Sequence, residues 1–309
     1  MRTIAIVNQK GGCGKTTCAI NLGAILASRG HSTLLVDMDP QSHCAAGLGV
    51  PEDRIERSIV DLLRWDRDVP PSMDDFAWEV GRNLRLVPST VSLAGIEAAA
   101  GGIATRSDRD LRLKRVLDWF SGSFEFCLVD CPPTIGLLTF NALRASNEAL
   151  VPVETGYFAL KGAQKQYTTI QGIIRRFGHD LPIHVLPTLM DTKSQLASDI
   201  HEALGKRFPD SLLPVAIREH EVIREATSYG QPVLEYAPES GAMSDFNGLA
   251  DWLLSNEPVA RRIEPDELDG ADEHVRVVSE VALEPLVEVD ENSRAAELAR
   301  RITTGGNAP

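Results

Sequence analysis

Short apolar runs alternate with longer amphipathic segments along the first 256 residues of the chain. The short runs are apolar through successive residues, which predicts strands that are covered on both faces of a sheet. These predicted strands span residues 3–8, 32–37, 84–88, 126–130, 149–153 and 183–188. The segments between them predict helices over residues 15–29, 92–101, 109–120, 136–146, 160–177, 194–207, 219–228 and 243–255. This alternation is typical of an α/β fold, a doubly wound and mostly parallel sheet with helices on both faces.

Two stretches depart from the alternation. Residues 50–83 are rich in proline and aspartate, and we interpret them as an insertion over the sheet edge with a short helix near residues 56–64. Residues 258–309 hold 12 acidic and 6 basic side chains and are punctuated by proline. Such a composition predicts a largely disordered acidic tail. We therefore expect one folded domain over residues 1–257 and a tail over residues 258–309.

The composition also indicates in which cellular compartment the protein works. Although 43% of the 309 residues are hydrophobic, no apolar run approaches the ~18 residues that a membrane helix needs. Five scattered cysteines without a C-x-x-C spacing argue against a disulfide framework. We expect a cytoplasmic protein that makes no membrane contact. The net charge of −13 argues mildly against a generic nucleic-acid binder, although the predicted tail contributes −6 of it.

A glycine-rich segment, KGGCGKTT at residues 10–17, directly follows the first predicted strand. Glycines let the backbone point successive N–H groups inward, and the next helix begins with its positive dipole end at the same place. Both features suit a phosphate-binding loop, in which Lys15 reaches the β- and γ-phosphates and Thr16 ligates Mg²⁺. The ordinary loop has a glycine five residues before the Gly-Lys pair, where this chain has Gln9.

Two further predicted strands end in carboxylates. The run LLVDMDPQ, residues 34–41, carries Asp37 and Asp39, and a carboxylate at this site could orient an attacking water. The strand over residues 126–130 ends in Asp130, which could hold Mg²⁺ through water. One aspartate after an apolar strand is weak evidence. Together with the glycine loop, Asp39 and Asp130 indicate a site for Mg²⁺ and a nucleotide.

Lys10, inside the glycine loop, makes the segment resemble the deviant Walker A motif (Lys-Gly-Gly-x-Gly-Lys-Thr) of the ParA/MinD family. Five segments follow in the order seen in chromosome- and plasmid-partitioning ParA proteins, including the Soj branch. They are NQKGGCGKTT, LLVDMDPQ, LVDCPPTIGLLTFNAL, YFALKGAQ and EATSYGQPV. The chain is similar to members that consist of one doubly wound domain.

The resemblance implies an ATPase that uses ATP and Mg²⁺ and forms a homodimer with ATP, in which Lys10 crosses to the partner's nucleotide. It also implies Asp39 as the water-orienting residue, Asp130 as the Walker B residue on Mg²⁺, and Thr17 near the α-phosphate. The residues implied around the phosphates are Gly11, Gly12, Cys13, Gly14, Lys15, Thr16 and Thr17. Family members position DNA or another large cargo, with hydrolysis stimulated by a ParB-like or cargo-adaptor protein.

Two segments depart from the family pattern. Gly156 and Lys161 stand where the family often has glutamates. A common Ile-Pro-Arg segment near the adenine reads instead Ile217-Arg218-Glu219. The resemblance places the adenine contacts around Met190 and Arg218.

A basic stripe runs along the helix predicted over residues 160–177. At 100° per residue, Lys161, Lys165 and Arg176 fall within about 60° of one another. The stripe is either a solvated helix face or a surface for sequence-independent contact with DNA phosphates, and Arg224 is a further candidate. DNA binding would associate the protein with the nucleoid.

Two other classes of protein share this loop. An iron–sulfur carrier needs paired cysteines at a dimer axis, and Cys127 and Cys131 are the only near pair. A biosynthetic ATP-dependent ligase, for example one that makes dethiobiotin or a cobyrinate amide, needs an additional substrate site that the sequence does not reveal. The preferred interpretation is the ATP-switched positioning protein.

Overall fold

A computed structural model describes residues 1–98, 102–156, 159–178 and 181–258. Seven strands of these residues form one sheet in the order β3-β4-β2-β5-β1-β6-β7. All neighbouring strands are parallel except β3 and β4. The strands are β1 (Arg2–Ile6), β2 (Thr33–Asp37), β3 (Trp78–Gly81), β4 (Leu84–Val87), β5 (Phe126–Asp130), β6 (Glu148–Glu154) and β7 (Ile183–Thr188). The predicted α/β sheet is confirmed.

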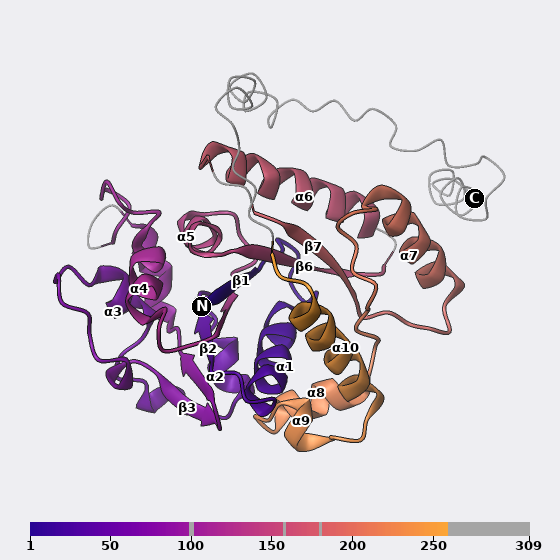
Figure 1. Ribbon diagram of the computed structural model, residues 1–309, viewed down its shortest axis with the longest axis horizontal. Helices are drawn as coiled ribbons and strands as arrows, with labels where there is room; N and C mark the ends of the chain where they lie inside the picture. Colours follow the sequence, from indigo (N-terminus) through magenta and orange to yellow (C-terminus); the bar gives the residue numbers. More distant parts are fainter. Residues whose placement is uncertain (99–101, 157–158, 179–180, 259–309) are drawn as a thin grey trace, which may run out of the picture. The chain divides into compact units, whose positions relative to one another are not determined.

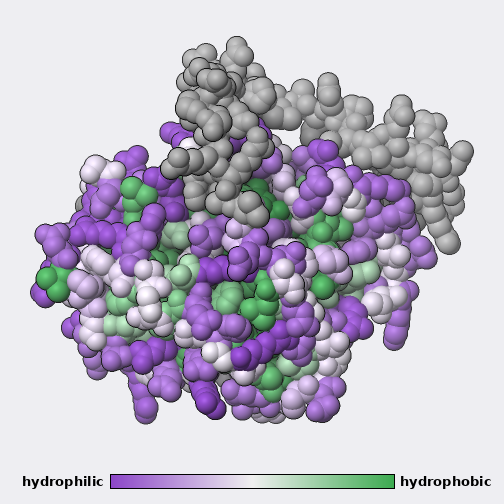
Figure 2. All heavy atoms as spheres, viewed as in Figure 1, coloured by the Kyte–Doolittle hydropathy of each residue, from purple (hydrophilic) through white to green (hydrophobic). Residues whose placement is uncertain are grey.

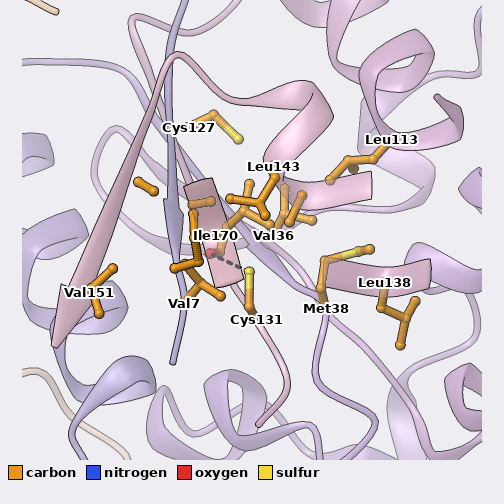
Figure 3. Packing of buried hydrophobic residues seen from close by; sticks show 14 of the residues in the cluster. Val7, Val36, Met38, Leu113, Cys127, Cys131, Leu138, Leu143, Val151 and Ile170 are labelled. Carbon is orange, nitrogen blue, oxygen red and sulfur yellow. Dashed lines mark hydrogen bonds between the residues drawn. The ribbon is translucent and has the colours of Figure 1, made fainter. Parts of the chain in front are cut away.

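The sheet is buried on both faces because successive strand residues enter two separate cores. In β1, Ala5 packs into one core, and Ile4 and Ile6 pack into the other. Figure 3 shows part of the first core, where Val7 and Val36 pack with Leu143 and Ile170.

Helices cover both of these faces (Figure 1). The first face is covered by α3 (Ile59–Arg64), α4 (Arg112–Phe120), α5 (Leu137–Ala145), α6 (Ala159–Arg176) and α7 (Gln195–Arg207). The second is covered by α1 (Lys15–Ser28), α2 (His43–Gly47), α8 (Glu221–Ser228), α9 (Val233–Tyr236) and α10 (Gly241–Ser255). Most predicted helices agree with these bounds to within one to three residues at their ends.

One predicted helix is wrong. An α-helix was expected over residues 92–101, but Val91–Glu97 form a 3-10 helix, and residues 99–101 lie outside the described part of the chain. Leu93 and Ile96, three positions apart, are both buried, which suits the three-residue turn of a 3-10 helix. The short helices α2 and α9 were not predicted at all.

The insertion over residues 50–83 contributes an edge strand as well as a helix. Its predicted short helix is α3, which begins at a capping box in which Ser58 and Asp61 bond each other's backbone N–H groups. Its strand β3 pairs antiparallel with β4 through a turn in which Asn83 has φ 61°. A strand of four residues with a half-exposed pattern carries little periodicity, so the sequence did not reveal it.

No helix among the described residues is long and apolar enough to cross a membrane. On the face drawn in Figure 2, hydrophilic side chains dominate and hydrophobic ones gather in small separate groups. The acidic tail predicted over residues 258–309 lies, apart from Pro258, outside the described residues.

Candidate functional site

The glycine loop leads from β1 directly into the buried helix α1. Gly12 has φ 71° and Gly14 has φ 92°, left-handed values that glycine adopts without strain. A Cβ atom built on Gly11 or Gly12 would meet nothing within 4 Å, so this side of the loop is open. Gly14 is the N-cap of α1 and uses no side chain there. No side-chain cap occupies this helix end, and uncapped first-turn N–H groups suit a bound anion.

The first two residues of α1, Lys15 and Thr16, are each held by a side-chain hydrogen bond. Lys15 is 8% exposed, and its Nζ donates a hydrogen bond of 3.1 Å to the backbone oxygen of Lys10. The ammonium group thus lies over the loop itself. The Thr16 hydroxyl donates a hydrogen bond of 2.6 Å to Asp130 Oδ2. These two side chains stand where the sequence predicted contacts with phosphate and Mg²⁺.

Asp130 and Asp37 are neighbours at the carboxyl ends of β5 and β2. They are paired in the strand register, and Asp130 is also paired with Ile6 of β1. Burial raises the pKa of Asp130 to about 6. Burial, followed by the charge of Asp130, raises the pKa of Asp37 well above its usual range. Two buried carboxyl groups side by side favour a bound cation or a shared proton.

Asp37 shapes the loop that carries Asp39. Its Oδ1 accepts a hydrogen bond of 2.9 Å from the Asp39 N–H, and its Oδ2 accepts one of 3.1 Å from the Cys44 N–H. Asp39 is 7% exposed, and its Oδ1 accepts a bond of 3.0 Å from the Gln41 N–H. The candidate catalytic carboxylate is therefore fixed by the strand end before it. Sequence reasoning noted Asp37 but gave it no role.

Two more residues of this site were missed. The Cys44 thiol lies 3.5 Å from Asp130 Oδ2, and with Asp37 these ligand atoms all lie within 4.8 Å of one another. Thr188, at the end of β7, donates a hydrogen bond of 2.8 Å to the backbone oxygen of Cys13. The Cys44–Asp130 and Thr188–Cys13 contacts join residues 86 and 175 positions apart, and no local motif marks Cys44 or Thr188.

The two predicted adenine residues lie beside each other past the end of β7. Met190 and Arg218 form an isolated parallel β-bridge, and the Met190 N–H donates a hydrogen bond of 3.3 Å to the backbone oxygen of Ile217. The Arg218 guanidinium is committed to Asp245, with Nη2 2.6 Å from Oδ1, and this hydrogen-bonded ion pair raises the pKa of Arg218. Because Asp245 occupies its Nε and Nη2 groups, Arg218 would contact an adenine through its backbone or the aliphatic part of its side chain.

The Lys10 side chain is 52% exposed. Its Nζ forms an ion pair with Glu154 at the end of β6. The two lysines of the glycine loop are thus placed differently, since Lys15 is buried over the loop and Lys10 reaches toward solvent.

The residues present fit a nucleotide with Mg²⁺. Asp130 Oδ1 is buried and has no hydrogen-bond partner among the described residues, although an acceptor in that position is costly to leave unpaired. Mg²⁺ prefers hard oxygen ligands and retains water, which the Thr16 hydroxyl and a nearby carboxylate accommodate. The open glycine backbone, Lys15 and the α1 N-terminus would hold the phosphates.

The predicted DNA residues do not form one surface. Lys161, Lys165 and Arg176 are all exposed on α6, and none of them forms an ion pair with another described residue. Arg224 lies on α8, on the other face of the sheet, and is paired with Glu219 at 2.9 Å. The structure therefore keeps the stripe together and separates Arg224 from it.

The fold and the glycine loop define a P-loop nucleoside triphosphatase of the doubly wound class. The chain belongs to the ParA/MinD family, and the family model described as an AAA domain matches residues 1–183. Sporulation initiation inhibitor protein Soj of Bacillus subtilis is 37% identical over 256 residues, which cover 82% of this chain and 99% of Soj. The chromosome partitioning protein ParA of Myxococcus xanthus is 34% identical, covering 83% of this chain and 89% of that protein.

A solved structure shares this fold and contains a nucleotide. Cobyrinic acid a,c-diamide synthase of Mycobacterium smegmatis, with bound ADP and magnesium, superposes with a TM-score of 0.67 at 30% identity. The match covers 82% of this chain and 94% of that one.

Proposed function

We propose that this protein is an ATP-dependent switch that dimerises around ATP and Mg²⁺ and positions or segregates DNA or another large cargo. The observation that carries the proposal is the different placement of Lys15 and Lys10 in one loop. Lys15 is buried over its own loop, whereas Lys10 is half-exposed and so accessible to a second copy. We assign this activity to residues 1–257, with residues 258–309 as an acidic tail.

Each group has a separate part in hydrolysis of ATP to ADP and phosphate. Lys15 and the N-terminus of α1 would bind phosphate oxygens. Thr16 and, through water, Asp130 would hold Mg²⁺, which neutralises phosphate charge when bound. Asp39 orients the attacking water. Asp37 accepts a hydrogen bond from the Asp39 N–H and so keeps the Asp39 backbone in one position, which favours a fixed geometry. A partner protein, ParB-like or a cargo adaptor, would stimulate this slow step.

The named relatives support the chromosome as the cargo that this protein positions. The Myxococcus xanthus relative is named a chromosome partitioning protein, and a chromosomal cargo would place this protein in the cytoplasm, associated with the nucleoid. The exposed stripe of Lys161, Lys165 and Arg176 would supply sequence-independent phosphate contacts, and a dimer would carry two copies of it.

Light scattering of the full chain tests the switch. ATP with Mg²⁺ should convert monomer to dimer, ADP should not, and phosphate release should follow at a slow basal rate. A chain that binds ATP yet stays monomeric at all concentrations would refute the dimerising switch.

The likeness to the Mycobacterium smegmatis protein supports a second candidate, a cobyrinic acid amide synthase. An assay of ATP-dependent amidation of cobyrinic acid separates the two candidates, because a partitioning switch needs no such acceptor. The iron–sulfur carrier gains no support, since all five cysteines are buried and Cys127 and Cys131 are 0% exposed.

A further inference from the structure

Lys10 is held on its own chain by a residue 144 positions away. Its ammonium group pairs with Glu154, whose strand β6 lies next to β1 in the sheet. The Lys10 side chain is 52% exposed and that of Glu154 is 34% exposed. The pair therefore lies at the surface, where a second copy could reach it.

The two residues before Lys10 are attached to the same part of the fold. Asn8 Nδ2 donates a hydrogen bond of 2.6 Å to the Pro152 oxygen of β6. The Gln9 N–H donates one of 3.2 Å to Gln166 Oε1 of α6. Gln166 is 2% exposed, and its Nε2 has no partner among the described residues. An unpaired buried donor disfavours this arrangement relative to one that supplies an acceptor.

We infer that Glu154 is a positioning residue that holds Lys10 on its own chain, in competition with the phosphates of a second copy. The inference rests on the proposed function, in which Lys10 crosses the dimer interface. The ammonium group cannot bind Glu154 and reach the partner's nucleotide at once. Loss of the Lys10–Glu154 pair is therefore part of the free-energy cost of dimer closure. Glu154 sets how much ATP-loaded protein is needed before dimers form.

The test measures the dimer dissociation constant of the full chain by sedimentation with Mg²⁺ and a non-hydrolysable ATP analogue. Glu154→Gln keeps the shape of the side chain and removes its charge. Because exposed ion pairs contribute little, we expect the dimer to tighten by about two- to fivefold. The gain should shrink at high salt, which screens the pair. As a matched control, Glu202→Gln removes an exposed glutamate paired with Lys206 on α7 and should leave the constant unchanged.

A double variant shows whether the effect passes through Lys10. In a Lys10→Ala background Glu154→Gln should add nothing, because the residue that it restrains is gone. A Glu154→Gln dimer as weak as wild type or weaker, or an equal gain without Lys10, would overturn the inference while leaving the switch intact. A wild-type chain that does not dimerise, or a Lys10→Ala chain that dimerises normally, would overturn the proposed role of Lys10 itself.

Discussion

Thr16 donates a hydrogen bond of 2.6 Å to Asp130, so that the first turn of α1 meets the end of β5 at one buried carboxylate. The other oxygen of that carboxylate has no partner among the described residues. A hydroxyl and a half-paired carboxylate at the start of a glycine-loop helix form a small site of hard oxygen ligands. Mg²⁺ bound at this site would favour the ionised form of Asp130.

Replacing Lys15 should weaken nucleotide binding without unfolding the protein. Lys15→Ala removes the ammonium group that lies over the loop, and a charge-assisted hydrogen bond of this kind corresponds to about a tenfold to hundredfold change in affinity. Calorimetry with ATP and Mg²⁺ measures the change. Lys114→Ala, at an exposed lysine paired with Asp118 on α4, is the control. An unchanged dissociation constant for Lys15→Ala would refute the assignment of the loop.

Replacing Asp39 should separate binding from hydrolysis. Asp39→Ala leaves Lys15, Thr16 and Asp130 in place, so ATP binding and dimerisation should persist. Hydrolysis should slow by about a hundredfold or more, because the attacking water loses its orienting group. Phosphate release under single-turnover conditions measures this rate. If the variant hydrolysed ATP as fast as wild type, the role would pass to another carboxylate.

Stability should depend on pH through Asp130. Its folded pKa of about 6 lies above the usual 3.8, so the folded chain binds this proton more tightly than the unfolded chain. Without divalent cations, the free energy of unfolding should therefore fall as pH rises from about 4 through 6, by on the order of 2–3 kcal/mol. Mg²⁺ with ADP favours the ionised carboxylate and should stabilise the protein more at about pH 7.5 than at about pH 5.

Denaturant titrations at the two pH values, with and without Mg²⁺ and ADP, measure the difference. Asp130→Asn cannot ionise and should remove the part of the fall that comes from Asp130, while Asp37, whose pKa burial also raises, keeps its own part. The variant should also lose the difference in stabilisation by Mg²⁺ and ADP between the two pH values. Equal stabilisation by Mg²⁺ and ADP at the two pH values would contradict the assignment of Asp130.

Charge reversal on α6 should remove DNA binding and leave dimerisation intact. Each phosphate contact steepens the log–log salt dependence by about 0.9 for duplex DNA, so a dimer should bind more tightly and with greater salt sensitivity than a monomer. Lys161→Glu with Arg176→Glu should abolish a gel shift that wild type shows with ATP but not with ADP. Lys114→Glu with Lys206→Glu changes the net charge equally on other helices and should have little effect. If dimers form at low salt and DNA stays unbound, the stripe is a solvated helix face and a protein cargo becomes the better candidate.

Local sequence determined the parts of this protein whose physics is local. The apolar runs at residues 126–130 and 183–188 predicted β5 and β7 residue for residue, because a strand buried on both faces needs successive apolar side chains. The glycine loop, Lys15 and Thr16 were likewise predictable, since the backbone angles at Gly12 and Gly14 and the start of α1 depend on adjacent residues. The edge strand β3 escaped because four half-exposed residues carry no period.

Only the tertiary structure decided which distant residues complete the site. Asp37 lies beside Asp130 because β2 and β5 pair in one register, and a shift of one residue would move either side chain to the other face. Glu154 reaches Lys10 because the strand order places β6 beside β1, and Thr188 reaches Cys13 because β7 is the next strand after β6. Strand order and register arise from the packing of both cores at once. For that reason a glutamate with no motif around it, 144 residues from the loop, could be assigned to Lys10 only in the folded chain.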